Sequence, residues 1–389
     1  MYCKNVASLI SYIKEKRQNP NVHLKFGIDG GRGFLKICLS VQDTSINANG
    51  RTTKPSSEKF KRRKYNDNAG NDDTFKDSGV KKIFILAIAQ NCQENYSNVL
   101  KLWNILKIND FQGTIATDLK LANLLAGIGS HSSMYPCTYC LADKNNLHVC
   151  GVYRTTDNCK KFFEKWRENG SDLKKAKEYK SCINEPVVKR EKITKIIDII
   201  PPPQLHLMIG VVNTLVTHMQ QKFEDITNLW IKSCGVERQI THGGSGFNGN
   251  SCKDLLEAKN TEKLKKFCEE NENDECLKYV SVFESFKDVV DDCFSNELKP
   301  TYAESIMKFK SEYLTLNISV TPKVHAVFFH IKDFCAQQKR GLGFFCEQAI
   351  ESVHFDFDCT WNKYKVLKSN HNYANQLLRA VIEYNSNHI

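Results

Sequence analysis

The chain has 389 residues and a net charge of +11, from 55 lysines and arginines against 44 aspartates and glutamates. Apolar residues make up 41% and charged residues 25%, a balance that excludes a mostly disordered chain. No apolar run approaches the ~18 residues of a membrane-spanning helix, so we expect no membrane partner. The positive charge favours a polyanionic partner such as nucleic acid, although many basic proteins bind none.

The sequence contains 16 cysteines. A chain of this length can bury its own core, so we expect reduced thiols and not a disulfide scaffold. The N-terminus has only a short apolar stretch, Val6 to Ile10, and lacks the longer apolar region of a signal peptide. We therefore expect a protein of the cytosol or nucleus, with a few cysteines available to bind metal.

The first part of the chain is predicted to contain strands and then alternating helices. Residues 23–41 are apolar and β-branched on both sides of a glycine-rich centre, which predicts two strands joined by a tight turn. Further strands are predicted at 80–89 and 113–117, with helices at 94–107 and 119–128. A series of strands followed by alternating helices and strands indicates an α+β fold, in which helices flank a mixed sheet.

A hydrophilic insertion interrupts this pattern at residues 42–79. It contains the basic run Lys61–Lys64. Such a run is typical of a solvated loop, and equally of a nuclear-import signal or a phosphate-contacting patch. The later part of the chain is predicted to be mainly helical from Cys159 to about Asn317, with further helices after Pro322 and at 344–364.

Two aspartates are candidates for a metal site. Asp29 lies in the apolar segment FGIDGG, where a carboxylate is costly unless it is paired or binds a metal. Asp118 follows the strand at 113–117 and precedes a helix. Each has an ordinary explanation, since Asp29 could cap a β-turn and Asp118 could be a helix N-cap. Two carboxylates at strand ends of one sheet are also how a magnesium site is built.

Glu347 and Glu351 lie one helical turn apart in CEQAIESVHFDFD. Either could supply a third carboxylate from a helix, or the pair could face solvent. Three carboxylates can hold two Mg or Mn ions ~4 Å apart, which activate an attacking oxygen and stabilise a leaving one.

Cys137 and Cys140 form the only C-x-x-C of the chain, within YPCTYC. His325 and His330 are separated by four residues, a usual spacing for zinc-binding histidines. Cysteine and histidine are the ligands of closed structural zinc sites. The two pairs are far apart in the sequence, so the spacing does not establish that they meet, and either histidine could be an ordinary, partly buried one.

The order of these features resembles the DDE transposases of the Transib group and the catalytic subunit of the RAG recombinase. The order is an Asp on a first strand, an Asp after a later strand, C-x-x-C, a long helical stretch, H-x-x-x-x-H and a Glu on a final helix. The resemblance covers roughly Leu24 to Tyr364. It implies a ribonuclease H-like core with a large helical, zinc-bearing insertion, and it implies four segments. They are a remnant N-terminal helix (1–22), the first part of the core (23–130), the zinc knuckle and helical insertion (131–320), and the zinc histidines with the catalytic helix (321–389).

The resemblance also implies roles for individual residues. Asp29, Asp118 and Glu351 look like the three catalytic carboxylates, which hold the Mg or Mn ions. The implied ligands of a structural zinc ion are Cys137, Cys140, His325 and His330. Leu205-His206 and Phe247–Leu256 look like further landmarks of the family, without an assigned role.

The function that follows is metal-dependent DNA cleavage and strand transfer in the nucleus, through a hairpin intermediate and by analogy as a homodimer. Because residues 1–22 are too short for the DNA-binding region that precedes the core in this family, one alternative is an inactive, transposon-derived protein. It would keep zinc and bind nucleic acid or protein. Another is a metal-dependent nuclease or phosphatase, which would need no zinc quartet.

Overall fold

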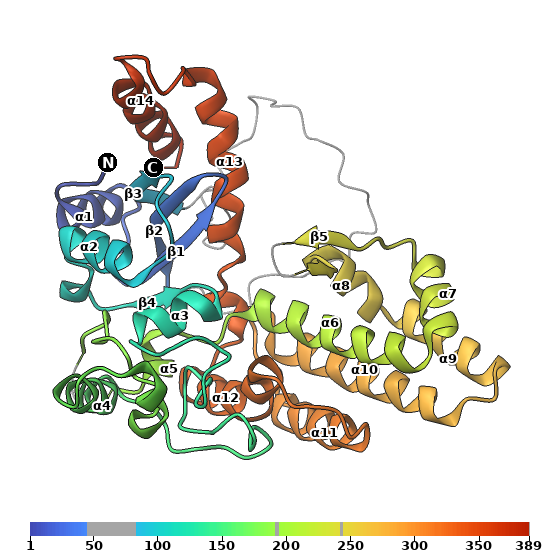
Figure 1. Ribbon diagram of the computed structural model, residues 1–389. Helices are drawn as coiled ribbons and strands as arrows, with labels where there is room; N and C mark the ends of the chain where they lie inside the picture. The colour runs from blue at the N-terminus through green and yellow to red at the C-terminus, as the bar shows by residue number, and fades with distance from the viewer. Residues whose placement is uncertain (45–82, 191–193, 242–243, 389) are drawn as a thin grey trace.

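The computed structural model describes residues 1–44, 83–190, 194–241 and 244–388. The basic run Lys61–Lys64 and nearly all of the predicted insertion lie outside these ranges. The fold is a mixed α+β fold, as expected, with a small sheet and many helices (Figure 1). Within the described ranges, no helix is both long enough and apolar enough to cross a membrane.

Four strands form one sheet in the order β3-β2-β1-β4. The strands are β1 (Val22–Gly31), β2 (Phe34–Asp43), β3 (Ile83–Gln90) and β4 (Thr114–Ala116). β2 is antiparallel to both β1 and β3, whereas β4 is parallel to β1. Arg32 and Gly33 form the tight turn between β1 and β2, and both have positive φ angles (50° and 79°), which glycine adopts readily.

Helices surround the sheet and extend away from it. Those beside the sheet are α1 (Val6–Lys16), α2 (Tyr96–Leu106), α3 (Leu119–Leu125), α13 (Gln348–Tyr364) and α14 (Tyr373–Ser386). The others are α4 (Thr156–Glu168), α5 (Ile196–Ile199), α6 (Gln204–Lys222), α7 (Glu224–Cys234), α8 (Gly249–Leu256), α9 (Ala258–Glu270), α10 (Asp274–Cys293), α11 (Tyr302–Thr315) and α12 (Pro322–Gln338). Short elements are the 3-10 helices Ile108–Asp110, Leu173–Tyr179 and Leu342–Phe345, and the hairpin β5 (Gln239–Thr241) and β6 (Gly244–Gly246).

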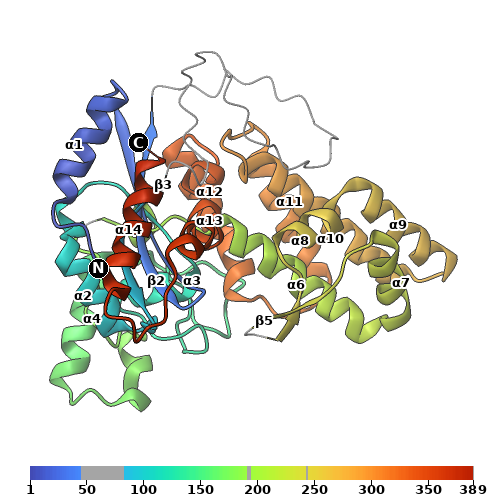
Figure 2. The same cartoon turned by 90° about the horizontal axis from the view of Figure 1, so that it is seen from above.

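The two faces of the sheet are covered by different helices. Alternate side chains of a strand point to opposite faces, so Phe26 and Ile28 of β1 pack into the core shared with α1 and α2. The opposite face, which includes Phe34 and Cys38 of β2, packs against α13 and α14. Figure 2 shows α13 and α14 on the side of the strands away from α1. The odd-numbered positions of β1 therefore face α13.

A helical lobe extends from one side of the sheet region (Figure 1). It contains α6 to α10, and its core is apolar and aromatic, with Trp230 and Phe283 in ring contact at 5.2 Å. α6 begins directly after Pro201–Pro203 and its contacts with α12 and with α7 join the sheet region to the lobe. The start of α6 also lies beside α13, because His206 of α6 contacts Glu351 of α13.

Two boundaries and one helix differ from the prediction. Gln42 was expected in the insertion but belongs to β2, because its buried side chain donates a hydrogen bond to the carbonyl of Phe344. The helix expected at 344–364 begins at Gln348, after a 3-10 turn and Glu347, whose carbonyl accepts the first helical hydrogen bonds. The sequence analysis did not predict α14.

Candidate metal centres

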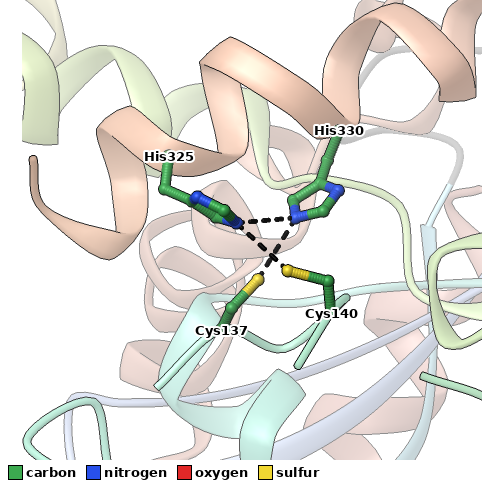
Figure 3. A group of neighbouring side chains, drawn as sticks. All are labelled: Cys137, Cys140, His325 and His330. Carbon is green, nitrogen blue, oxygen red and sulfur yellow. Dashed lines mark hydrogen bonds between the residues drawn. The ribbon is translucent and has the colours of Figure 1, made fainter. Parts of the chain in front are cut away.

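Two cysteines and two histidines meet in the interior, as the sequence pattern suggested. Cys137 and Cys140 lie on the long loop between α3 and α4, whereas His325 and His330 lie on α12 and point toward them (Figure 3). The Sγ of Cys137 is 3.2 Å from Nε2 of His330, and the Sγ of Cys140 is 3.2 Å from Nε2 of His325. All four side chains are buried.

The donor set fits a zinc ion. All four candidate ligand atoms lie within 4.8 Å of one another. Zinc bonds of about 2.0–2.3 Å place tetrahedral ligands roughly 3.5 Å apart, close to the separations seen here. Burial raises the pKa of Cys137, whereas a hydrogen bond from the Cys137 thiol lowers the pKa of Cys140. This buried, polar group could hold a zinc ion.

Neighbouring groups orient the two histidines. Nδ1 of His325 lies 2.7 Å from the carbonyl oxygen of Leu147, so this nitrogen carries the proton and Nε2 is left with a lone pair. Nδ1 of His330 lies 3.5 Å from the hydroxyl of Tyr153, which itself donates to Asp333 at 2.6 Å. Such contacts fix ring orientation and tautomer at metal sites.

A fully buried arginine supports the cysteine loop. Nε of Arg154 donates to the carbonyl oxygens of Cys137 and Cys140, at 3.0 and 3.2 Å. Its terminal nitrogens donate to the carbonyls of Tyr135 and Lys180 and contact the sulfur of Cys182. Arg154 comes close because the backbone at 139–141 pairs with that at 152–154. Arg154 was not predicted from the sequence, since a single arginine carries no periodic signal.

Four carboxylates line one small cavity beside the sheet. Asp29 extends from β1 toward α13, and Asp118 follows β4 and caps α3 with a 2.7 Å bond from the Leu121 N–H. Glu351 and Glu347 reach the same cavity from α13 and the residue before it. The structure therefore brings the three predicted carboxylates to one place. Asp118 is a helix N-cap, and it also lines this cavity.

Glycines allow the close packing around Asp29. A Cβ at Gly27 would lie 1.7 Å from Cδ1 of Ile350, so α13 can approach β1 only because this position has no side chain. A Cβ at Gly30 would lie 2.1 Å from the carboxylate of Glu94 on the other face. Gly27 thus lets the carboxylates of β1 and α13 lie close together.

Two histidines contact the carboxylates of the cavity. His206, at the start of α6, lies 3.1 Å from Glu347 through Nδ1 and 3.3 Å from Glu351 through Nε2. Burial lowers the pKa of His206, but the hydrogen bond and charge of Glu347, with the charge of Glu351, raise it to about 9. His354, on α13, lies 2.9 Å from Asp29. The sequence marked His206 only as a landmark and gave no role to His354.

Glu351 is the carboxylate whose charge is most affected by these surroundings. Its pKa is raised to about 7, first by burial and then by the charges of Glu347 and the two aspartates, which together outweigh the lowering effect of the His206 charge. Carboxylates that repel one another in a partly buried site favour protons or cations.

One oxygen of each carboxylate is held by a donor or a histidine. The pairs are Asp29 with His354, Asp118 with the Leu121 N–H, Glu347 with His206, and Glu351 with His206. The second oxygen of Glu347 is buried and has no hydrogen-bond partner among the described residues. Within the described ranges, however, only the cysteine–histidine group has three or more candidate ligand atoms within 4.8 Å of one another. The carboxylates are thus oriented, but less tightly gathered than the quartet.

Comparison of the sequence with protein-family models and with curated proteins finds no match. The function is therefore argued from the geometry of these two centres.

Proposed function

We propose that the chain is a DDE-type transposase or recombinase that cleaves and joins DNA strands with two Mg or Mn ions. The observation that carries the proposal is the cavity shared by Asp29, Asp118 and Glu351, which come from three separate parts of the chain. The strand order β3-β2-β1-β4, with β4 alone parallel to its neighbour, fits the ribonuclease H-like core expected from the resemblance.

The residues of the cavity have distinct tasks in this proposal. Asp29 and Asp118 are fixed on the sheet and the α3 cap, and Glu351 closes the site from α13. Bound divalent ions would supply an activated oxygen nucleophile and charge neutralisation at the phosphate. The protein contributes by positioning the carboxylates, because phosphoryl transfer depends on placement and electrostatics. His354 and His206 orient Asp29 and Glu351.

Zinc would have a structural role. The quartet ties the loop at 137–140 to α12, and α12 is followed within a few residues by α13, which carries Glu351. Metal binding at a buried site contributes directly to folding stability. Zinc would therefore hold α13 in place relative to the sheet. DNA is the proposed partner, contacted through the excess of lysine and arginine, with a homodimer and a nuclear location following the resemblance.

Manganese-dependent nicking of a labelled duplex by the purified chain tests the proposal. Asp118→Asn is the informative variant, because asparagine also caps helices while its carbonyl is a weaker cation ligand. We expect nicking by the wild type and a loss of about 100-fold or more in the variant. Asp110→Asn, at an exposed position, is the control. Equal cleavage by all three proteins would indicate a contaminant, and no cleavage by any of them would contradict the proposal.

A second candidate function is a transposon-derived protein that keeps the fold and zinc but does not cut. Two observations favour this second candidate. The carboxylates are not among the groups whose ligand atoms lie within 4.8 Å of one another, and Asp29 and Glu351 already have histidine partners. This protein would bind a labelled duplex in a gel-shift assay, with or without Mn²⁺, and leave it intact. Nicking that Asp118→Asn abolishes would rule out this candidate.

A further inference from the structure

Glu347 is the most buried carboxylate of the acidic cavity, with 2% of its surface exposed. Its Oε1 accepts a 3.0 Å hydrogen bond from the backbone N–H of His206 and lies 3.1 Å from Nδ1 of the same residue. Its Oε2 is buried and has no hydrogen-bond partner in the described part of the chain. A buried carboxylate oxygen without a partner is energetically costly, so the site needs an explanation.

The walls of the cavity provide no donor for this oxygen. The lining residues are Ile28, Asp29, Ala116, Thr117, Asp118, Glu347, Ile350 and Glu351. Their side chains are apolar or acidic except for Thr117, whose hydroxyl donates to the carbonyl of Ile28 at 2.9 Å. Glu347 therefore lines a space with three other carboxylates, and the basic side chains in contact with these carboxylates, His206 and His354, leave its Oε2 without a partner. A cation from solvent is the group that satisfies such an arrangement.

We propose that Glu347 is a fourth carboxylate ligand of this cavity and binds a divalent cation through Oε2. The proposal rests on the proposed function and extends it from three ligands to four. A fourth carboxylate adds negative charge at the place where divalent cations would bind. His206 holds Oε1 and so orients Oε2, as neighbouring donors do at other metal sites.

This assignment also connects the cavity to the helical lobe. Because the N–H of His206 is near the start of α6, the same carboxylate that binds the cation accepts a hydrogen bond from the helix that leads into the lobe. A shift of α6 would move Glu347, so binding in the cavity and the position of α6 are coupled through one side chain.

Titration of the zinc-loaded full-length chain with Mn²⁺, followed by electron paramagnetic resonance of free Mn²⁺, tests the proposal. Glu347→Gln keeps an Oε1 acceptor for His206 and removes the charge. We expect its Mn²⁺ affinity to fall by about 10- to 100-fold at one or more sites. Glu351→Gln should show a comparable loss, and Glu284→Gln, exposed on α10, should bind as the wild type does.

The outcomes separate the two proposals. If Glu351→Gln and Asp118→Asn weaken Mn²⁺ binding but Glu347→Gln does not, the fourth ligand is ruled out and the proposed function stands. If none of these variants changes Mn²⁺ binding, the acidic cavity is not a cation site and the proposed function fails with it.

A purely structural role for Glu347 would give a different pattern. The melting temperature without Mn²⁺ would then fall in Glu347→Gln, and the Mn²⁺ affinity of the folded fraction would stay at the wild-type value. We expect instead that Mn²⁺ raises the melting temperature of the wild type more than that of the variant. Glu347→Asp, which keeps the charge but withdraws it by one methylene, should bind Mn²⁺ more weakly than the wild type. Unchanged Mn²⁺ affinity in both variants would overturn the proposal.

Discussion

Nε2 of His354 lies 2.9 Å from Oδ2 of Asp29, a contact between residues 325 positions apart in the chain. It connects α13 to the middle of the sheet, one turn of helix beyond Glu351. The other ring nitrogen of His354 contacts Nζ of Lys36, which is buried on the same face of β2. The first strand, the second strand and α13 are thereby joined through one imidazole.

Removal of this imidazole should affect both stability and the acidic cavity. In His354→Ala, buried Lys36 loses a polar partner and Asp29 loses its orienting contact. We expect a loss of about 1–3 kcal/mol in the free energy of unfolding and about 10-fold weaker Mn²⁺ binding. Urea denaturation and Mn²⁺ titration measure the two effects. His371→Ala, at an exposed position, is the control, and equal values for both variants would contradict the prediction.

Loss of one zinc ligand should release the metal and destabilise the protein. In Cys137→Ser, the remaining three ligands bind zinc weakly, so the purified variant should contain less than the single zinc equivalent expected of the wild type. We expect the free energy of unfolding to fall by at least about 3 kcal/mol. Atomic absorption gives the zinc content. Cys359→Ser, which replaces an exposed cysteine, should retain zinc; full zinc content in Cys137→Ser would disprove the assignment.

Arg154→Lys should weaken the same site without touching a ligand. A lysine has one nitrogen in place of the planar fork, so it cannot reach the carbonyls of both Cys137 and Cys140 together with those of Tyr135 and Lys180. We expect a loss of about 3–5 kcal/mol in stability and about 10-fold weaker zinc binding in competition with a chelator. The exposed Arg167→Lys provides the comparison. Equal stability and zinc affinity in the two arginine variants would contradict this role of Arg154.

Stability should depend on pH through His23. Burial, and then the charges of Lys25 and Arg340, lower the pKa of His23 to about 4, below the value of about 6.5 in an unfolded chain. The neutral ring, which contacts the Thr114 hydroxyl at 2.8 Å, therefore stabilises the fold in full above pH 6.5. This contribution falls as the pH falls toward 4, because the unfolded chain then binds the proton more readily.

Comparison with His23→Gln isolates the effect. When the pH falls from 7 to 5, the free energy of unfolding should decrease by up to about 2 kcal/mol more in the wild type than in the variant. Urea denaturation at the two pH values measures this difference. An equal decrease in the free energy of unfolding in both proteins would show that His23 does not cause this pH dependence.

Local signals in the sequence predicted most elements near the sheet. Burial leaves a pattern in the local sequence. It is seen in the apolar runs of β1, β2 and β3 and in the spacing of Val99 and Trp103 on the buried face of α2. The start of α3 at Asp118 follows from its capping side chain. The boundaries at Gln42 and Glu347 were wrong, because contacts from distant segments decide where these elements end and begin.

The candidate sites were predicted in part. The sequence supplied ligand types at suitable spacing within each pair, Cys137 with Cys140 and His325 with His330. It could not show that the pairs meet, because closing a loop of 185 or more residues depends on the whole fold.

The sequence by itself determined the α+β class, the strand pattern and the kinds of side chain available for metal. Tertiary structure alone decided which side chains surround each centre. Arg154 and His354 have no distinctive local pattern, and the partners of these two residues and of Glu347 lie 14 to 325 residues away. Burial makes these polar groups costly unless they are paired. Their partners come from segments that pack together only in the folded protein, so the local sequence cannot identify them.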